Sequence, residues 1–143
     1  TAGDFSILAT DLSSPILDLA KEGIYTEAEL ARGLTPGQKA RFTTLLPGPK
    51  PRFQMKPELR TMVEFRRINL LENVKSLGLF DLILCRNVLI YFTDGLKRQI
   101  CEMYHAMLMP SGYLMLGAAE SLFGITECFQ TERSGDTLLF RKP

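Results

Sequence analysis

The sequence predicts an α/β protein with a mostly parallel sheet that ends in an antiparallel hairpin. Apolar runs of strand length occur at 5–10, 80–85 and 113–117, and helical patterns lie between them. Strands that alternate with helices favour a parallel sheet joined by right-handed crossovers. The last two strand-like segments flank Ser134-Gly135, a pair typical of a hairpin turn.

The first half of the chain is expected to hold one strand followed by helices. The strand covers residues 5–10 and is followed by Asp11. A helix then begins near Ser13-Ser14-Pro15, because a hydroxyl can cap it and proline fits its first turn. Gly23 ends that helix. Shorter helices are predicted over 27–32 and 36–46, and the prolines of 47–51 predict a turn.

Two further strands are expected in the middle of the chain. Residues 60–71 place Val63, Phe65 and Ile68 among charged neighbours, which favours a strand. The run 80–85 is almost continuously apolar, a pattern typical of a strand buried on both faces of a parallel sheet.

The last third of the chain supplies one long helix and three strands. Thr93-Asp94 can cap a helix that runs to about Met109 and is ended by Pro110-Ser111-Gly112. A buried strand is predicted at 113–117. Hairpin strands follow at 128–133 and 136–141.

Composition and charge are those of an ordinary globular chain. Its 143 residues are 45% hydrophobic and 23% charged, and 17 basic residues nearly cancel 16 acidic ones. This balance gives no electrostatic reason to expect nucleic acid, and no apolar run is long enough for membrane insertion. The first residues do not have the pattern of a secretory signal.

Cysteine and histidine usage argues against a metal site. The 3 cysteines form no CxxC pair, so neither a disulfide framework nor a zinc site is expected, and a reducing compartment is the simpler interpretation. The single histidine, His105, lies in a helical stretch without a second histidine to share a metal. We therefore interpret it as a partly buried helix residue.

Polar residues follow three of the candidate parallel strands. Asp11 follows the first, Asn69 the second, and Arg86-Asn87 the third. Ligands of open α/β sheets bind at the carboxyl ends of the strands, where a carboxylate can accept from ribose hydroxyls. The alternatives are local: Asp11 can cap a helix and Asn69 can stabilise a turn. Arg86-Asn87 is harder to explain by packing, so the set favours a nucleoside site.

The run Phe80-Asp-Leu-Ile-Leu-Cys-Arg-Asn-Val-Leu-Ile-Tyr-Phe92 closely resembles a segment of chemotaxis-receptor (CheR-type) methyltransferases. Similar motifs surround it in the family's order, and the resemblance covers essentially the whole chain. They are Ala9-Thr-Asp11, Val63-Glu-Phe65, Asn69-Leu70, Pro110-Ser-Gly-Tyr-Leu114 and Leu116-Gly-Ala-Ala-Glu-Ser-Leu122.

The resemblance implies a Rossmann-like fold of S-adenosylmethionine-dependent methyltransferases and a cytoplasmic enzyme that methylates glutamate side chains of chemoreceptors. S-adenosylmethionine is the implied cofactor and S-adenosylhomocysteine the product. Matching positions place Asp11 at the ribose and Asn69 with Leu70 at the adenine. They place Asn87 with Val88 along the methionine part, and Tyr91 beside the transferring methyl group as the catalytic residue.

The match also predicts what the chain lacks. We expect a single, truncated domain over 1–143, with a small insert at about 35–60 and without the family's first strand and glycine-rich loop. The chain alone is then expected to bind S-adenosylhomocysteine weakly or not at all, and its unpaired sheet edges favour self-association. The insert also lacks a glycine pair associated with binding of a receptor tail peptide, which puts tail tethering in doubt.

Eight basic residues against two acidic ones occupy the stretch from Lys39 to Arg67. One interpretation is a docking face for the acidic, glutamate-bearing helices of a chemoreceptor, with Arg52, Lys56 and Arg60 as the docking residues. The other is an ordinary solvated surface.

Two rival functions are considered. A nicotinamide-binding Rossmann domain would carry a GxGxxG run after a strand, and the chain has none. A non-catalytic fragment or partner-binding module with the same fold remains the alternative, and titration with the cofactor product separates it from the enzyme.

Overall fold

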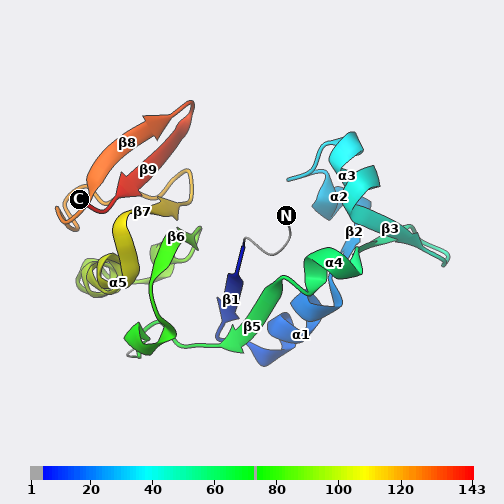
Figure 1. Cartoon of the computed structure of the whole chain (residues 1–143), viewed down its shortest axis with the longest axis horizontal. Coiled ribbons are helices and arrows are strands. Elements are labelled where there is room, and N and C mark those ends of the chain that lie inside the picture. The colour runs from blue at the N-terminus through cyan, green and yellow to red at the C-terminus, as the bar shows by residue number, and fades with distance from the viewer. Residues whose placement is uncertain (1–4, 73) are drawn as a thin grey trace. The chain divides into compact units, whose positions relative to one another are not determined.

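The computed structural model describes residues 5–72 and 74–143, which form two compact units. Unit 1 is Thr1–Asn69 and unit 2 is Leu70–Pro143. Each unit is an α/β structure with its own sheet or sheets (Figure 1). The single domain over 1–143 stays a prediction. The prediction that the first residues are not a secretory signal falls partly on residues 1–4, which lie outside the described residues.

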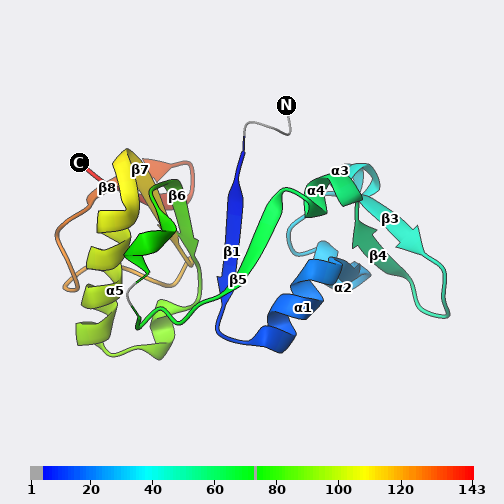
Figure 2. The same cartoon turned by 60° about the horizontal axis from the view of Figure 1, so that its bottom comes forward.

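Unit 1 begins with a parallel strand pair covered by one helix. Strand β1 (Ile7–Asp11) pairs in parallel with β5 (Val63–Arg67), and α1 (Ser14–Glu22) connects onward from β1. Figure 2 shows α1 beside this pair. Ser13 caps α1 and Gly23, in the left-handed conformation at φ 62°, ends it, as predicted.

The insert between α1 and β5 contains a small antiparallel sheet that the sequence did not predict. Its strands are ordered β2-β4-β3. The bounds of the insert's elements are β2 (Ile24–Thr26), α2 (Glu27–Leu30), α3 (Pro36–Phe42), β3 (Thr43–Leu46), β4 (Arg52–Met55) and α4 (Pro57–Arg60).

The helix predicted over 36–46 is therefore wrong in its last turn. Residues 43–46 pair antiparallel with β4, from Thr43↔Met55 to Leu46↔Arg52. Two adjacent threonines favour extended backbone, and the proline-rich turn at 47–51 returns the chain for pairing. Arg60 ends α4 and is not in a strand, so the strand predicted over 60–71 begins later, at Val63.

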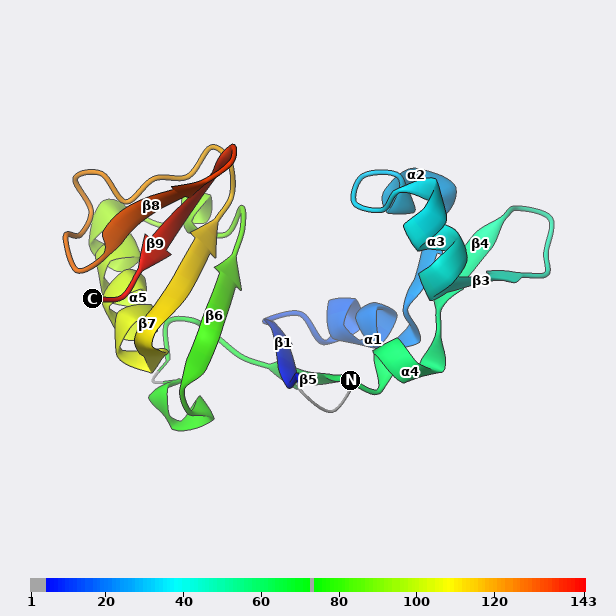
Figure 3. The same cartoon turned by 45° about the horizontal axis from the view of Figure 1, so that its top comes forward.

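Unit 2 is a four-stranded mixed sheet with one helix packed on it. The strand order is β6-β7-β9-β8, in which β6 and β7 are parallel and the last two pairings are antiparallel (Figure 3). The bounds are η2 (Lys75–Leu77), β6 (Phe80–Cys85), η3 (Leu89–Tyr91), α5 (Asp94–Met107), β7 (Leu108–Leu116), β8 (Gln130–Ser134) and β9 (Thr137–Arg141).

The predicted parallel arrangement and terminal hairpin are thus confirmed, with shifted boundaries. Helix α5 stops at Met107, two residues earlier than expected, because Leu108 already pairs with Phe80. The hairpin turns at Gly135, whose φ of 59° is in the left-handed region.

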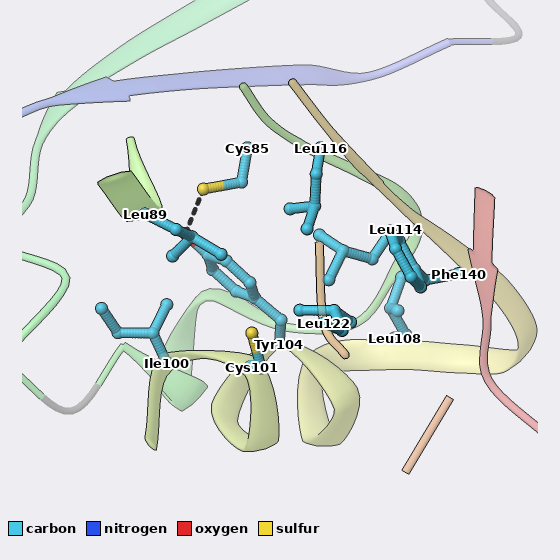
Figure 4. Packing of buried hydrophobic residues seen from close by; sticks show 10 residues of the cluster. All are labelled: Cys85, Leu89, Ile100, Cys101, Tyr104, Leu108, Leu114, Leu116, Leu122 and Phe140. Carbon is cyan, nitrogen blue, oxygen red and sulfur yellow. Dashed lines mark hydrogen bonds between the residues drawn. The ribbon is translucent and has the colours of Figure 1, made fainter. Parts of the chain in front are cut away.

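The core of unit 2 lies between α5 and one face of the sheet. It contains Cys85, Leu89, Ile100, Cys101, Tyr104, Leu108, Leu114, Leu116, Leu122 and Phe140 (Figure 4). Strand β6 forms an edge of this sheet, and the side chains of Leu82 and Leu84 on its other face are 52% and 62% exposed. The expectation that the run 80–85 is buried on both faces is wrong here, because α5 covers only the Cys85 face.

Candidate functional site

The loop that follows β6 carries the densest group of predicted site residues. Strand β6 ends at Cys85, and the single turn η3 begins two residues after Asn87. Asn87 has a φ of 58°, which few residues other than glycine adopt, although asparagine tolerates it better than most. Such a conformation at the carboxyl end of a parallel strand is a feature of functional sites.

The carboxylate of Glu120 binds the backbone of this loop. Its Oε2 accepts hydrogen bonds from the N–H of Asn87 at 2.7 Å and the N–H of Gly117 at 2.8 Å. Its Oε1 accepts from the N–H of Ile90 at 3.3 Å. We call these three bonds the Glu120 network. They join the segment after β7 to the loop after β6.

The electrostatics of Glu120 favour its ionised form. Partial burial raises the pKa of the carboxyl, but the donors on Gly117, Asn87 and Ile90 outweigh this effect, and the pKa lies below its usual value of 4.5. Hydrogen bonds from neutral donors to a charged acceptor are among the stronger ones in proteins.

Gly117 lies against the same network. A Cβ atom at this position would come within 2.8 Å of Glu120 Oε2 and 3.0 Å of the Asn87 nitrogen, and still closer to Asn87 Oδ1. Real Cβ atoms do not approach other atoms so closely. The loop therefore packs directly onto the backbone at the end of β7, and a larger residue at position 117 would displace the Asn87 and Glu120 side chains.

The side chains of the loop divide into anchors and exposed groups. Leu89 is buried in the core, and Val88 is half-buried against it. Tyr91 is 81% exposed, so its ring does not pack in the core. Asn87 is exposed as well. The loop thus presents an amide, a phenol and the half-exposed Ile90, while Val88 and Leu89 hold it to the core.

A buried tyrosine contacts the cysteine that ends β6, directly before the loop. The Tyr104 hydroxyl donates to Cys85 Sγ at 3.4 Å (Figure 4). Burial raises the pKa of both groups, and it raises the pKa of the neighbouring Cys101 to about 12. These groups are therefore neutral at physiological pH and serve packing rather than acid–base chemistry.

Of the predicted cofactor residues, Asn87, Val88 and Tyr91 lie together in this loop. Leu70 belongs to the same unit and packs against its core. Asp11 and Asn69 belong to unit 1, and so the set is divided between the units.

In unit 1, Asp11 is the last residue of β1 and lies opposite Arg67 in the parallel pair. Its Oδ1 accepts a hydrogen bond from the Ser13 N–H at 2.7 Å, while Ser13 itself caps α1. Within the described residues no hydrogen bond reaches the second oxygen of Asp11. The residue thus stabilises the local turn and also retains an acceptor at the carboxyl end of a parallel strand.

The three predicted docking residues differ in their surroundings. Arg52 is exposed, and Lys56 precedes α4 and lines a shallow hollow with Arg41 and Phe42. Arg60 instead donates to the backbone oxygen of Lys21 from Nε at 3.2 Å and from Nη2 at 3.0 Å. Its guanidinium therefore serves the carboxyl end of α1.

Other basic residues of the stretch are also engaged inside unit 1. Lys39 pairs with Glu27 at 2.7 Å and Arg66 with Glu64 at 2.6 Å. Arg67 donates to the Leu12 oxygen at 3.0 Å. Fewer basic side chains are thus free to reach a partner than the sequence count indicates.

A larger hollow of unit 1 lies away from the predicted site. Its lining includes Ile7, Val63 and Glu64, at the amino ends of β1 and β5 and opposite to Asp11. Within the described residues no group of three or more potential metal ligands occurs, and no helix is long and apolar enough to cross a membrane.

The sequence prediction missed Glu120. The residue stands in the segment Gly117-Ala-Ala-Glu120, part of a motif of the family resemblance that carries no role there. A glycine directly after a buried strand indicates that another backbone segment packs closely there, and an acid three residues later can accept hydrogen bonds from that segment. The sequence does not show that the segment contains Asn87, 33 residues before Glu120.

Each unit carries groups that suit a part of an S-adenosyl cofactor. An amide that both donates and accepts suits an amino acid moiety, a half-buried valine suits its methylene groups, and a carboxylate suits ribose hydroxyls. The left-handed turn at Asn87 lies at the carboxyl end of a parallel strand, where ligands of such sheets bind.

Comparison with known proteins agrees with this chemistry. Residues 1–137 match the family model described as CheR methyltransferase, SAM binding domain. The chain is 43% identical over 136 residues to chemotaxis protein methyltransferase 1 of Pseudomonas aeruginosa, with 94% of this chain and 48% of that protein covered. It is 40% identical over 136 residues to chemotaxis protein methyltransferase 1 of Vibrio cholerae, with 95% and 49% covered.

The fold has a relative among solved structures. The N-methyltransferase NodS from Bradyrhizobium japonicum WM9 superimposes with a TM-score of 0.55 at 18% identity, over 96% of this chain and 74% of that one. This likeness shows a Rossmann-like methyltransferase fold. The chain spans about half the length of the curated relatives it matches. It belongs to the CheR methyltransferase family, whose cofactor is S-adenosylmethionine.

Proposed function

We propose that this chain forms the cofactor-binding part of a methyltransferase that transfers methyl groups from S-adenosylmethionine to glutamate side chains of chemotaxis receptors. The observation that carries the proposal is the loop after β6, where Asn87 is strained and exposed and Tyr91 extends into solvent. Family membership supplies the reaction class.

The cofactor residues take roles that match their chemistry. Asp11 accepts hydrogen bonds from the ribose hydroxyls, and Asn69 with Leu70 borders the adenine. Asn87 and Val88 line the methionine part. Tyr91 lies beside the reacting methyl group.

The proposed methyl transfer needs no acid–base catalysis by the protein. When bound, S-adenosylmethionine supplies a methyl group on a positively charged sulfur. The acceptor glutamate is already ionised at neutral pH, because its pKa is about 4.3, so no general base is needed. Tyr91 orients the acceptor through its exposed hydroxyl, and catalysis comes mainly from positioning and from exclusion of water from the reacting groups.

The partner is the acidic, glutamate-bearing helix of a chemoreceptor in the cytoplasm. Arg52 and Lys56 supply the docking charge, supported by the exposed Arg41 beside Lys56. Arg60 contributes to docking through the shape of the α1–α4 junction that it stabilises.

The alternative is a non-catalytic module with the same fold. It differs from the enzyme in one measurable way, because a module that only binds a partner has no use for the cofactor. Titration of S-adenosylhomocysteine into the complete gene product therefore separates the two.

The test is calorimetric titration of S-adenosylhomocysteine into the complete gene product and into its Asp11→Ala and Asp18→Ala variants. Asp18 is an exposed acid on α1 that pairs only with Lys21 among the described residues, so its loss is a matched control. We expect binding in the wild type and in Asp18→Ala, and a loss of at least tenfold in Asp11→Ala, which equals about 1.4 kcal/mol.

Methyl transfer is then measured from labelled cofactor to a purified receptor cytoplasmic fragment. The control fragment carries glutamine at its methylation positions and has no carboxylate to accept the group. Binding of the cofactor product without transfer to the glutamate fragment contradicts the receptor as substrate. Absence of binding in the wild type contradicts the enzyme and favours the binding module.

A further inference from the structure

The Glu120 network connects two segments that follow neighbouring parallel strands. Strands β6 and β7 pair up to Cys85↔Leu116, so the loop at 86–91 and the segment at 117–122 leave the same edge of the sheet. At this edge the carboxylate of Glu120 accepts from Asn87, Ile90 and Gly117. It therefore binds both ends of the loop that contains Asn87 and precedes Tyr91.

The segment that carries Glu120 is itself anchored. The N–H of Glu120 donates to the Gly117 oxygen at 2.9 Å. Two residues later Leu122 is buried in the core, and the Ile125 oxygen accepts from Arg98 Nε of α5 at 2.8 Å. The carboxylate thus extends from a segment tied to both the sheet and the helix.

The loop, by contrast, has few other backbone partners. Its own bonds are those of the single turn, Tyr91 N–H to the Val88 oxygen at 3.2 Å and Phe92 N–H to the Leu89 oxygen at 3.0 Å. Neither involves the N–H of Asn87, the residue in the left-handed conformation. Glu120 supplies the acceptor for that N–H and offsets the backbone strain of Asn87.

We propose that Glu120 is a positioning residue for the cofactor, which holds the loop at 87–90 in the one geometry that presents the Asn87 amide and the Tyr91 phenol to the methionine part. The proposal rests on the proposed function. It adds a residue that makes no contact with substrate and acts through the backbone of those that do.

Glutamine in place of Glu120 tests the charge and the second acceptor with almost no change of volume. Its single oxygen can serve Asn87 and Gly117, but its NH₂ group then faces the N–H of Ile90, where two donors meet. Gly117→Ala is an independent second variant, because it keeps the carboxylate and displaces it sterically. Glu127→Gln is the matched control: Glu127 is exposed and has no hydrogen bond within the described residues.

Three quantities are measured on the complete gene product: the Kd for S-adenosylhomocysteine, the kcat and KM for methyl transfer, and hydrogen exchange of backbone amides. We expect Glu120→Gln and Gly117→Ala to raise the Kd about tenfold, as for the loss of one charge-assisted hydrogen bond. The KM for the receptor fragment stays unchanged, and exchange accelerates at Asn87 and Ile90. In Glu120→Gln, Leu114 stays protected. Glu127→Gln resembles the wild type in all three.

Unchanged exchange at Asn87 and Ile90 in Glu120→Gln overturns the proposal, because the carboxylate then does not hold the loop. Faster exchange with an unchanged Kd overturns it as well, because loop geometry then does not matter to the cofactor. Loss of protection at Leu114 in Glu120→Gln shows a general structural role and equally contradicts it. A wild type that binds no cofactor product refutes the proposed function, and the positioning role then fails together with it. The other outcomes refute the positioning role and leave the proposed function standing.

Discussion

The close approach at the end of β7 makes a quantitative prediction for Gly117→Ala. The new methyl group would lie 2.8 Å from Glu120 Oε2 and 3.0 Å from the Asn87 nitrogen. Overpacking of this kind costs about 1–3 kcal/mol. Displacement of the charge-assisted bond between Asn87 and Glu120 adds about 1.5–3 kcal/mol at most. Because the loop can relax by moving outward, we expect unit 2 to lose about 2–4 kcal/mol of unfolding free energy.

The matched control is a second glycine-to-alanine change in the same unit. A Cβ at Gly95, in the first turn of α5, has no atom within 4 Å. Alanine at this position should stabilise the helix by up to about 1 kcal/mol. The same chemical substitution is thus expected to give opposite signs at two sites in one unit.

The assay is native-state hydrogen exchange of the slowest amides of β6 and β7, followed by mass spectrometry. It reports the opening of unit 2 by itself, whereas a denaturation curve of the whole chain combines both units. A Gly117→Ala protein within about 0.5 kcal/mol of the wild type would refute the steric argument. In an Asn87→Gly background the cost should shrink, because the nearest clashing atom, Asn87 Oδ1, is then absent.

Three further predictions concern ionisation and the buried core. The pKa of Glu120 lies below its usual value, so the stabilisation that its carboxylate provides is complete above the unfolded-state pKa near 4.5 and is lost as pH falls through the lower folded-state pKa. In Glu120→Gln, the stability of unit 2, measured by hydrogen exchange or thermal unfolding, should therefore fall less steeply as pH is lowered through this range. Tyr104→Phe should cost only about 0.5–1 kcal/mol in chemical unfolding, because sulfur is a weak acceptor, and a loss above about 3 kcal/mol would mean that the Cys85 contact does more than satisfy a hydroxyl. Thiol-specific labelling read by mass spectrometry should modify the half-buried Cys128 before Cys85 and Cys101, whose pKa values are raised by burial; faster labelling of Cys101 would contradict its burial.

Much of the fold follows from local sequence signals. Ser13 and Gly23 bound α1 where a cap and a left-handed residue are expected, and Gly135 turns the final hairpin. The run 80–85 is a strand, and its neighbours alternate with helices as a parallel sheet requires. These elements depend on backbone preferences and apolar periodicity, which act over a few residues.

The small sheet of the insert did not follow from the sequence. Residues 43–46 continue a helical pattern, and β2 is only three residues long. Whether such segments become strands depends on partners elsewhere in the chain, here β4, and pairing partners leave no local signal. The exposure of Leu82 and Leu84 also depends on distant parts of the chain, because the sequence of an apolar strand does not indicate which of its two faces a helix covers.

The sequence by itself determined the family, the succession of strands and helices along the chain and the identity of the polar residues that follow the strands. The tertiary structure alone decided what those residues do within each unit: that Arg60 binds a helix end, that Asp11 also serves a turn, and that Tyr91 is exposed. It also supplied Glu120, because a carboxylate becomes a partner for Asn87 only when two neighbouring strands bring residues 33 positions apart to the same edge of a sheet. The fold determines which backbone N–H groups such a carboxylate meets, and the residue type alone does not predict them.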